Sequence, residues 1–148
     1  MSNPAFEDAF NLLCSDLIGR GIHRRVFECR LRDDLVVKVE DDEPRRFANV
    51  LEFEFWQDHQ HYEKVARWLA PVVFMSPDGR VILQKRCSPI PAGYDMPAKI
   101  PGFLTDTKLE NFGIFEGRLV CFDYALTIRN ASAKLRKADW GVLAHGAK

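Results

Sequence analysis

Residues 105–125 read TDTKLENFGIFEGRLVCFDYA, and this stretch spaces three polar side chains around an apolar hairpin. Asp106 is followed by Asn111, and the two apolar runs that come next end at Asp123. Carboxylate and amide oxygens suit Mg²⁺, which takes oxygen ligands and keeps substrate phosphates in its shell. Taken singly, Asp106 caps a turn and Asn111 accepts a left-handed conformation. Taken together, their spacing indicates a divalent-cation site.

Length and composition describe an ordinary globular chain. With 148 residues we expect one domain, residues 1–148, with enough chain to bury a core. Twenty-one basic residues balance twenty-one acidic ones, so no basic field favours nucleic acid or an anionic membrane. The N-terminal stretch does not resemble a signal peptide, and no apolar run approaches the length of a membrane span. The cysteines have no paired spacing, which suits a reducing cytoplasm.

Hydrophobic periodicity predicts an α+β chain with few helices. Helices are expected over residues 4–14, from the cluster DDEP at 41–44 onward, over 61–70 and over the polar segment 131–140. The helix after DDEP would present Phe47, Val50, Leu51 and Phe55 on one face. Strands are expected over 26–32 and 35–40, in a hairpin over 71–86 and in a second hairpin over 112–125. A proline-rich connector, residues 88–104, separates the two hairpins.

Two features between residues 17 and 40 point to an anionic ligand. Gly19 and Gly21 let the backbone approach a ligand closely, and they precede a strand, which excludes Rossmann and P-loop arrangements. Strand alternation places Val36, Lys38 and Glu40 on one face. A lysine buried there needs an anionic partner; the alternative is an edge-strand lysine that faces solvent.

The helix after this strand offers Glu52 and Glu54 as partners for Lys38. Residues two apart on a helix do not share a face, so at most one of these acids points inward. The other is expected to face solvent.

The order of these features resembles that of the protein-kinase-like superfamily: a glycine turn, a strand lysine, a helix glutamate, a hairpin, D-x-x-x-x-N, a hairpin and D-Y-A. The resemblance runs from about Leu17 to Ala125, and it is closest to short kinase-like proteins of bacteriophages and bacteria and to the aminoglycoside-phosphotransferase branch. It implies an α+β fold with a kinase-like N-lobe, an antiparallel sheet plus helix, over about residues 1–87. A strongly shortened C-lobe would occupy residues 88–148.

The same resemblance implies a nucleotide site. Gly19, Gly21 and Val26 match the glycine-rich loop over the triphosphate, and Lys38 matches the lysine that holds the α- and β-phosphates. Glu52 is the preferred match for the helix partner of Lys38, with Glu54 second. The hinge that holds adenine would lie at Gln84, Lys85, Arg86 and Cys87, with Val26 and Val36 against the adenine face.

Catalysis is implied by the opening stretch. Asp106 matches the aspartate that orients the attacking hydroxyl and accepts its proton, while Asn111 and Asp123 match the two Mg²⁺ ligands. The resemblance therefore implies ATP and Mg²⁺ as cofactors.

Several positions depart from the family pattern. Arg24 replaces the third loop glycine, and Ala125 replaces the glycine after the metal-binding aspartate. Leu104 and Thr105 replace the His-Arg pair before the catalytic aspartate, so control by phosphorylation of an activation loop is not expected. Only 25 residues follow Asp123, which is too few for a full helical lobe.

Three readings remain open from the sequence. The first is a minimal phosphotransferase that moves the γ-phosphate of ATP to a hydroxyl of a protein or small molecule. The second is a pseudokinase that binds a nucleotide or a partner protein with little chemistry. The third is a small α+β domain whose matches arise by chance.

Overall fold

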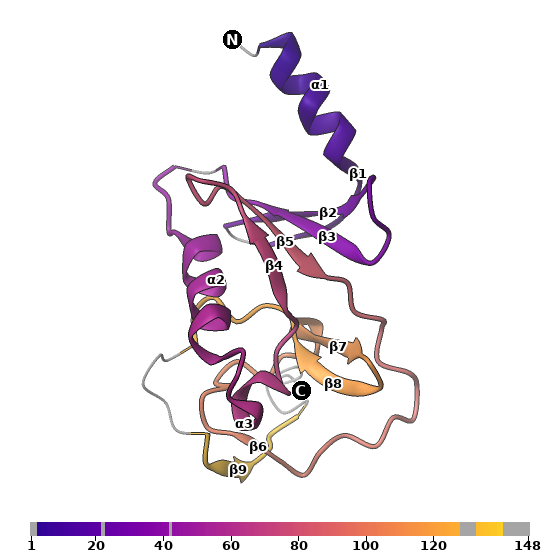
Figure 1. Ribbon diagram of the computed structural model, residues 1–148. Helices are drawn as coiled ribbons and strands as arrows, with labels where there is room; N and C mark the ends of the chain where they lie inside the picture. Colours follow the sequence, from indigo (N-terminus) through magenta and orange to yellow (C-terminus); the bar gives the residue numbers. More distant parts are fainter. Residues whose placement is uncertain (1–2, 22, 42, 128–132, 141–148) are drawn as a thin grey trace. The chain divides into compact units, whose positions relative to one another are not determined.

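A five-stranded antiparallel sheet is the largest element of the computed structural model (Figure 1). In spatial order its strands are β1 (Cys14–Arg20), β2 (Arg25–Cys29), β3 (Leu35–Val39), β5 (Val81–Lys85) and β4 (Val72–Met75). The predicted strand pair β2–β3 and the predicted hairpin β4–β5 are confirmed. β1 was not predicted; it contains Gly19, which the sequence suggested only as part of a glycine turn before a strand. The chain is α+β with few helices, as predicted.

The structure describes residues 3–21, 23–41, 43–127 and 133–140, and the chain divides into two units. The first unit comprises Met1–Phe53 and Val72–Arg86, and the second comprises Glu54–Pro71 and Cys87–Lys148. Residues 54–71, which we expected to group with residues 1–87, are part of the second unit.

Two helices accompany the sheet. α1 (Pro4–Leu13) forms where predicted, with Asn3 as its N-cap. α2 (Ala48–His59) begins later than the cluster DDEP suggested. Residues 43–47 are not helical, and Phe47 has a φ of 58°. The predicted apolar face is correspondingly wrong, since Phe47 lies outside the helix and is half exposed.

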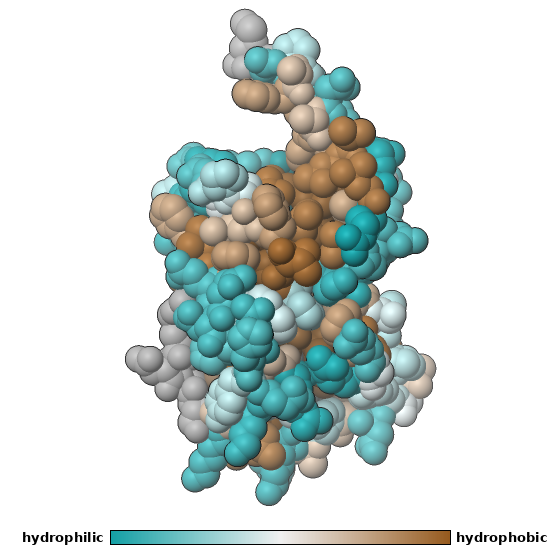
Figure 2. Space-filling model, viewed as in Figure 1, coloured by the Kyte–Doolittle hydropathy of each residue, from teal (hydrophilic) through white to brown (hydrophobic). Residues whose placement is uncertain are grey.

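The face of the sheet opposite Lys38 carries the apolar core of the first unit. Its buried members come from β1, β2 and β3: Cys14, Phe27, Cys29, Leu35, Val37 and Val39. Phe10 and Leu13 of α1 pack against them, and the ring of Phe10 meets that of Phe27 edge-on at 5.2 Å. Figure 2 shows apolar side chains gathered over the sheet and at the base of α1. Each fully buried Val, Leu or Phe contributes about 1.5–3 kcal/mol.

The second unit holds a short helix and two small two-stranded sheets. Its elements are α3 (Glu63–Ala66), β6 (Lys99–Pro101), the 3₁₀ turn η1 (Leu109–Asn111), β7 (Phe112–Phe115), β8 (Arg118–Cys121) and β9 (Leu135–Lys137). The predicted hairpin β7–β8 is confirmed. Its turn residues Glu116 and Gly117 both have positive φ, 51° and 79°, which is the conformation of a type I′ hairpin turn.

An aromatic cluster forms the core of the second unit. Phe55 lies 5.7 Å from Phe103 and 5.9 Å from Tyr124 between ring centroids. The Tyr124 hydroxyl donates a 2.7 Å hydrogen bond to the carbonyl oxygen of Ala70. Ala70 in turn donates its amide to Cys121 at the end of β8, so the cluster fixes the strand that leads to Asp123.

Two helix predictions in this unit are wrong. Of residues 61–70 only Glu63–Ala66 is helical. Leu135–Lys137, predicted as helix, is the strand β9 paired with β6, while Ala131 and Ser132 of that prediction lie outside the described residues. Among the residues that the structure describes, no helix combines the length and the apolar character needed to cross a bilayer.

Candidate functional site

Lys38 lies in the middle of β3, with strands paired on both sides of it. Its neighbours across the sheet are Val26 in β2 and Ile82 in β5. Its side chain is 2% exposed, so the edge-strand alternative from the sequence analysis does not hold. The face of the sheet that bears Lys38, here called the inner face, therefore carries a buried amine. A buried amine needs an anionic partner.

Glu52 of α2 is that partner. The Lys38 Nζ lies 2.7 Å from Glu52 Oε1, and Glu52 is 0% exposed. Glu54 is exposed, two positions further along the helix. Of the two acids that the sequence left open, Glu52 is the one that pairs with Lys38.

A second cation, Arg24, shares the same carboxylate. Its Nη1 lies 2.8 Å from Glu52 Oε1 and 3.2 Å from Asn49 Oδ1, and its Nη2 lies 3.4 Å from Glu52 Oε2. Burial alone would raise the pKa of Glu52, but the charges and hydrogen bonds of Arg24 and Lys38 hold that pKa at about 2. Glu52 is therefore ionised at neutral pH.

Glu40 and Asn49 position the helix that carries Glu52. The Glu40 carboxylate accepts hydrogen bonds from the backbone amides of Arg46, Ala48 and Asn49, which caps the start of α2. The Asn49 side chain donates to the carbonyl oxygens of Lys38 (3.1 Å) and Arg80 (2.9 Å). Glu52 follows Asn49 by three residues, so it faces the same strand.

The glycine turn lies between β1 and β2. Gly19 lies in β1, where it pairs with Val26 of β2. Gly21 follows β1, and its amide donates to the Arg24 carbonyl oxygen at 2.8 Å. A Cβ added at Gly19 or Gly21 would meet its nearest atom at 3.6 or 3.8 Å, which is ordinary contact. Packing within the protein therefore does not require glycine at either position.

The predicted adenine contacts are only partly grouped. Val26, Val36 and Gln84 share the inner face of the sheet with Lys38, as the pairing of Val26 with Lys38 and of Val36 with Gln84 shows. Lys85 forms an ion pair with Asp34 at 3.0 Å.

At the predicted hinge, the backbone amide of Arg86 is already hydrogen-bonded within the protein. Arg86 pairs with Glu28 and donates its backbone amide to the Asp34 carbonyl oxygen. That amide is thus committed within the protein, while Cys87 begins the second segment of the second unit.

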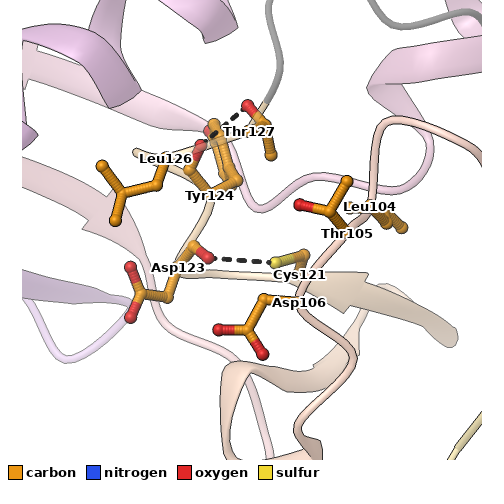
Figure 3. A pocket seen from close by; sticks show the side chains of 8 residues that line it. All are labelled: Leu104, Thr105, Asp106, Cys121, Asp123, Tyr124, Leu126 and Thr127. Carbon is orange, nitrogen blue, oxygen red and sulfur yellow. Dashed lines mark hydrogen bonds between the residues drawn. The ribbon is translucent and has the colours of Figure 1, made fainter.

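Asp106 and Asp123 line one pocket in the second unit. The pocket has a volume of about 260 Å³, and its other lining residues are Leu104, Thr105, Cys121, Tyr124, Leu126 and Thr127. Figure 3 shows the Asp123 carboxylate at the left and the Asp106 carboxylate below the centre, with Thr127 hydrogen-bonded to Tyr124 at the top of the view. Both aspartates are exposed, and Asp106 accepts a hydrogen bond from the Lys108 amide at 3.2 Å.

Asn111 is not part of this pocket's lining. It is 8% exposed and lies in η1. Its carbonyl oxygen accepts from the Phe122 amide at 2.9 Å, which ties η1 to the residue before Asp123. The structure thus brings Asp106 and Asp123 together in one pocket, and Asn111 is hydrogen-bonded to the residue that precedes Asp123.

The donor set of the pocket fits a hard cation. Its two carboxylates offer oxygen ligands, which Mg²⁺ prefers, while the Thr127 hydroxyl donates to the Tyr124 carbonyl oxygen at 2.9 Å. Across the described ranges, no three His, Cys, Asp or Glu side chains gather into a metal-binding group. Asp106 and Asp123 are the residues of this pocket that would hold Mg²⁺, together with phosphate oxygens or water.

Three residues of the buried network were not predicted as site residues: Arg24, Glu40 and Asn49. Glu40 carried a usable signal, because strand alternation puts it on the Lys38 face. Asn49 also carried one, since it lies one helical turn before Glu52. Arg24 appeared only as a departure from the glycine pattern.

No protein-family model matches the chain, and no curated protein matches it.

Proposed function

We propose that this chain is a minimal kinase-like phosphotransferase that binds ATP with Mg²⁺ and transfers the γ-phosphate to a hydroxyl of a protein or small molecule. The observation that carries the proposal is the buried 2.7 Å ion pair between Lys38 and Glu52. Protein kinases require an ion pair between a lysine of the third strand and a glutamate of the following helix. Lys38 lies in the third strand of the chain, and Glu52 lies in the next helix.

The sheet supports the kinase-like N-lobe in this proposal. Strands β1 and β2 flank a glycine turn, and α2 follows β3 directly. The inner face carries the apolar side chains of Val26, Val36 and Ile82 beside Lys38. In the proposal, Val26 and Val36 would lie against adenine and Lys38 would meet the phosphates.

Each residue would have one task in the transfer. Lys38 would hold the α- and β-phosphates, and Asp123, with Asp106 beside it in the pocket, would hold Mg²⁺, which neutralises charge on the phosphates when it is bound. Asn111, the other Mg²⁺ ligand that the resemblance implies, does not line this pocket. Asp106 would orient the acceptor hydroxyl. The acceptor oxygen forms a bond to the γ-phosphorus, the bond to the β–γ bridging oxygen breaks, and the hydroxyl proton passes to Asp106 as ADP leaves.

A second candidate is a pseudokinase that binds nucleotide or partner without efficient transfer. The position of Arg24 favours it, because this side chain already occupies the Glu52 carboxylate from the glycine turn. An arginine at this place competes with Lys38 for its partner.

Phosphate transfer distinguishes the two candidates. Wild type, Asp106→Asn and Glu110→Gln would be incubated with γ-labelled ATP and Mg²⁺, and with a dephosphorylated protein mixture or an aminoglycoside set as acceptors. Glu110 is an exposed acid of the same loop, so it serves as the matched control. We expect transfer by wild type and Glu110→Gln, and its loss in Asp106→Asn. Nucleotide binding without any transfer would favour the pseudokinase.

A further inference from the structure

The segment 134–139 contacts the loop around Asp106 at successive points. β9 pairs with β6, so Lys99, Ile100 and Pro101 lie opposite Lys137, Arg136 and Leu135. Directly after β6, the Gly102 amide donates to the Lys134 carbonyl oxygen at 2.9 Å. These contacts fix the chain as it enters the loop.

Two side chains continue the contacts past β6. Arg136 Nη2 donates to the carbonyl oxygen of Leu104 at 2.7 Å. Thr107 Oγ1 donates to Asp139 Oδ1 at 3.0 Å, and Arg136 Nη1 lies 3.5 Å from the same carboxylate oxygen. Leu104, Arg136, Asp139 and Thr107 thus form a continuous polar chain that brackets Asp106 on both sides.

This polar chain of Leu104, Arg136, Asp139 and Thr107, here called the bracket, contains an ion pair and is held by buried neighbours. The hydrogen bond from Thr107 is the main cause that lowers the pKa of Asp139, so this carboxylate stays ionised at neutral pH. Thr107 is 0% exposed, although threonine is usually found at the surface. Trp140 follows at once; its indole nitrogen donates to the Pro97 carbonyl oxygen at 2.7 Å, and its ring meets Phe112 edge-on at 5.0 Å.

Asp106 needs such support because its own side chain is exposed on an irregular loop. A group that orients a reacting hydroxyl must be held within about 0.5 Å of its productive position, and side chains on loops achieve this through surrounding hydrogen bonds. Leu104 and Thr107 are held two residues before and one residue after Asp106. The bracket therefore restricts the backbone that aims the Asp106 carboxylate into the pocket.

We propose that Arg136 and Asp139 are positioning residues for Asp106, acting through the Leu104 carbonyl and the Thr107 hydroxyl. This rests on the proposed function for the catalytic task of Asp106. β9 and the residues after it would then stabilise the loop around Asp106, although they lie about thirty residues further along the chain.

Thr107 allows a sharp test, because valine matches its shape without the hydroxyl and serine keeps the hydroxyl. Thr107→Val and Asp139→Asn would be compared with Thr107→Ser and with Lys137→Ala, an exposed side chain of the same strand. We expect kcat to fall roughly 10- to 100-fold in the first two, with the KM for ATP nearly unchanged. Thr107→Ser and Lys137→Ala would keep wild-type kcat.

Two further readouts separate this proposal from the function it rests on. Amide hydrogen exchange of residues 103–108 should accelerate in Thr107→Val, and Mn²⁺ affinity, read by electron paramagnetic resonance, should weaken. If wild type transfers no phosphate, the proposed function fails, and these two readouts still decide whether the bracket holds Asp106 in the pocket. Unchanged exchange and Mn²⁺ affinity, or faster exchange with wild-type kcat in an active protein, would overturn the proposal.

Discussion

At the scale of single residues, the Glu52 carboxylate carries the charges of both Lys38 and Arg24. All three side chains are at most 8% exposed, so water contributes little to their solvation. Removing one partner of a buried ion pair leaves the remaining charge uncompensated, which costs far more than the pair contributes when intact. Glu52 therefore determines whether both cations are tolerated inside the first unit.

Glu52→Gln should destabilise the protein by about 3–5 kcal/mol, because it leaves two buried cations beside a neutral amide. Glu54→Gln, at the exposed position two residues on, should change the free energy of unfolding by less than about 0.5 kcal/mol. Guanidinium unfolding followed by circular dichroism measures both. Equal small effects of the two substitutions would show that the Lys38–Glu52–Arg24 contacts do not form in solution.

The same carboxylate should make stability depend on pH. The pKa of Glu52 is lowered from an ordinary value of 4.5 to about 2 in the folded protein. The unfolded chain binds the proton at higher pH, so the stabilising contribution is complete above about pH 4.5 and is lost as the pH falls toward 2.

Wild type and Glu52→Gln should therefore differ by a constant free energy of unfolding from pH 7 to 5 and converge below pH 4.5. The pKa of Asp34 is also lowered, by its hydrogen bonds to Arg32 and Lys85. Both proteins should accordingly carry Asp34→Asn, which removes that second titration. A pH-independent difference down to pH 2.5 would contradict the assignment.

At this scale the sequence predicted Lys38, the two candidate acids and both pocket aspartates. The residue pattern did not choose between Glu52 and Glu54, because that choice depends on where α2 begins, and only the resemblance preferred Glu52. The start at Ala48 is set by the Glu40 carboxylate, eight residues earlier and directly after β3. Arg24 was missed as a partner because its contacts with Asn49 and Glu52 span 25 and 28 residues.

At the scale of elements, the glycine turn and the hairpin β7–β8 use glycine for different reasons. A Cβ at Gly113 would lie 2.8 Å from both the Cys87 Cβ and the Ser88 carbonyl oxygen. The bridge between Ser88 and Ile114 holds these segments together, so the backbone has no room to shift. Gly19 and Gly21 have no such neighbours.

Gly113→Ala should therefore destabilise the protein by about 1–3 kcal/mol through overpacking against backbone. Gly21→Ala should leave the melting temperature nearly unchanged. A thermal melt of both variants beside wild type checks this contrast. A stable Gly113→Ala protein would mean that β7 does not lie against residues 87–88.

Gly21→Ala should instead weaken ATP binding roughly tenfold, equivalent to about 1.4 kcal/mol, because an added methyl group keeps the turn from approaching the phosphates. Isothermal titration with ATP and Mg²⁺ measures the affinity, and Gly93→Ala provides a control at a glycine with no atom within 4 Å of an added Cβ. Gly93 has a φ of 77°, which strains any other residue, so the melting temperature of the Gly93→Ala protein must be measured first. An ATP affinity of Gly21→Ala equal to that of wild type would contradict the proposal that the turn at Gly21 contacts the nucleotide.

The hairpins were predictable because their strands are adjacent in sequence and their turns carry glycine. β9 was not, because its partner β6 lies more than thirty residues earlier, and a three-residue strand with exposed ends lacks a period of its own. Its sequence, LRK, is compatible with a polar helix until the pairing partner is known.

At the scale of the whole molecule, both units are built from two separated chain segments. Sequence reasoning that reads along the chain assigns residues 54–71 to the unit that precedes them. The aromatic contacts of Phe55 with Phe103 and Tyr124 join those residues to the second unit instead. Such long-range packing leaves no local pattern in the sequence.

The proposed function requires that the chain bind ATP with Mg²⁺ through Lys38 and Asp123. Its most direct test is a thermal melt of wild type, Asp123→Asn and Glu116→Gln, with and without ATP and Mg²⁺ at millimolar concentration. Glu116 is an exposed acid at the tip of the hairpin that leads to Asp123. A ligand at a hundred times its Kd stabilises by about 2.7 kcal/mol, which a melt resolves easily. We predict stabilisation of wild type and Glu116→Gln that is lost in Asp123→Asn. Identical melts with and without the nucleotide in all three proteins would contradict the claim.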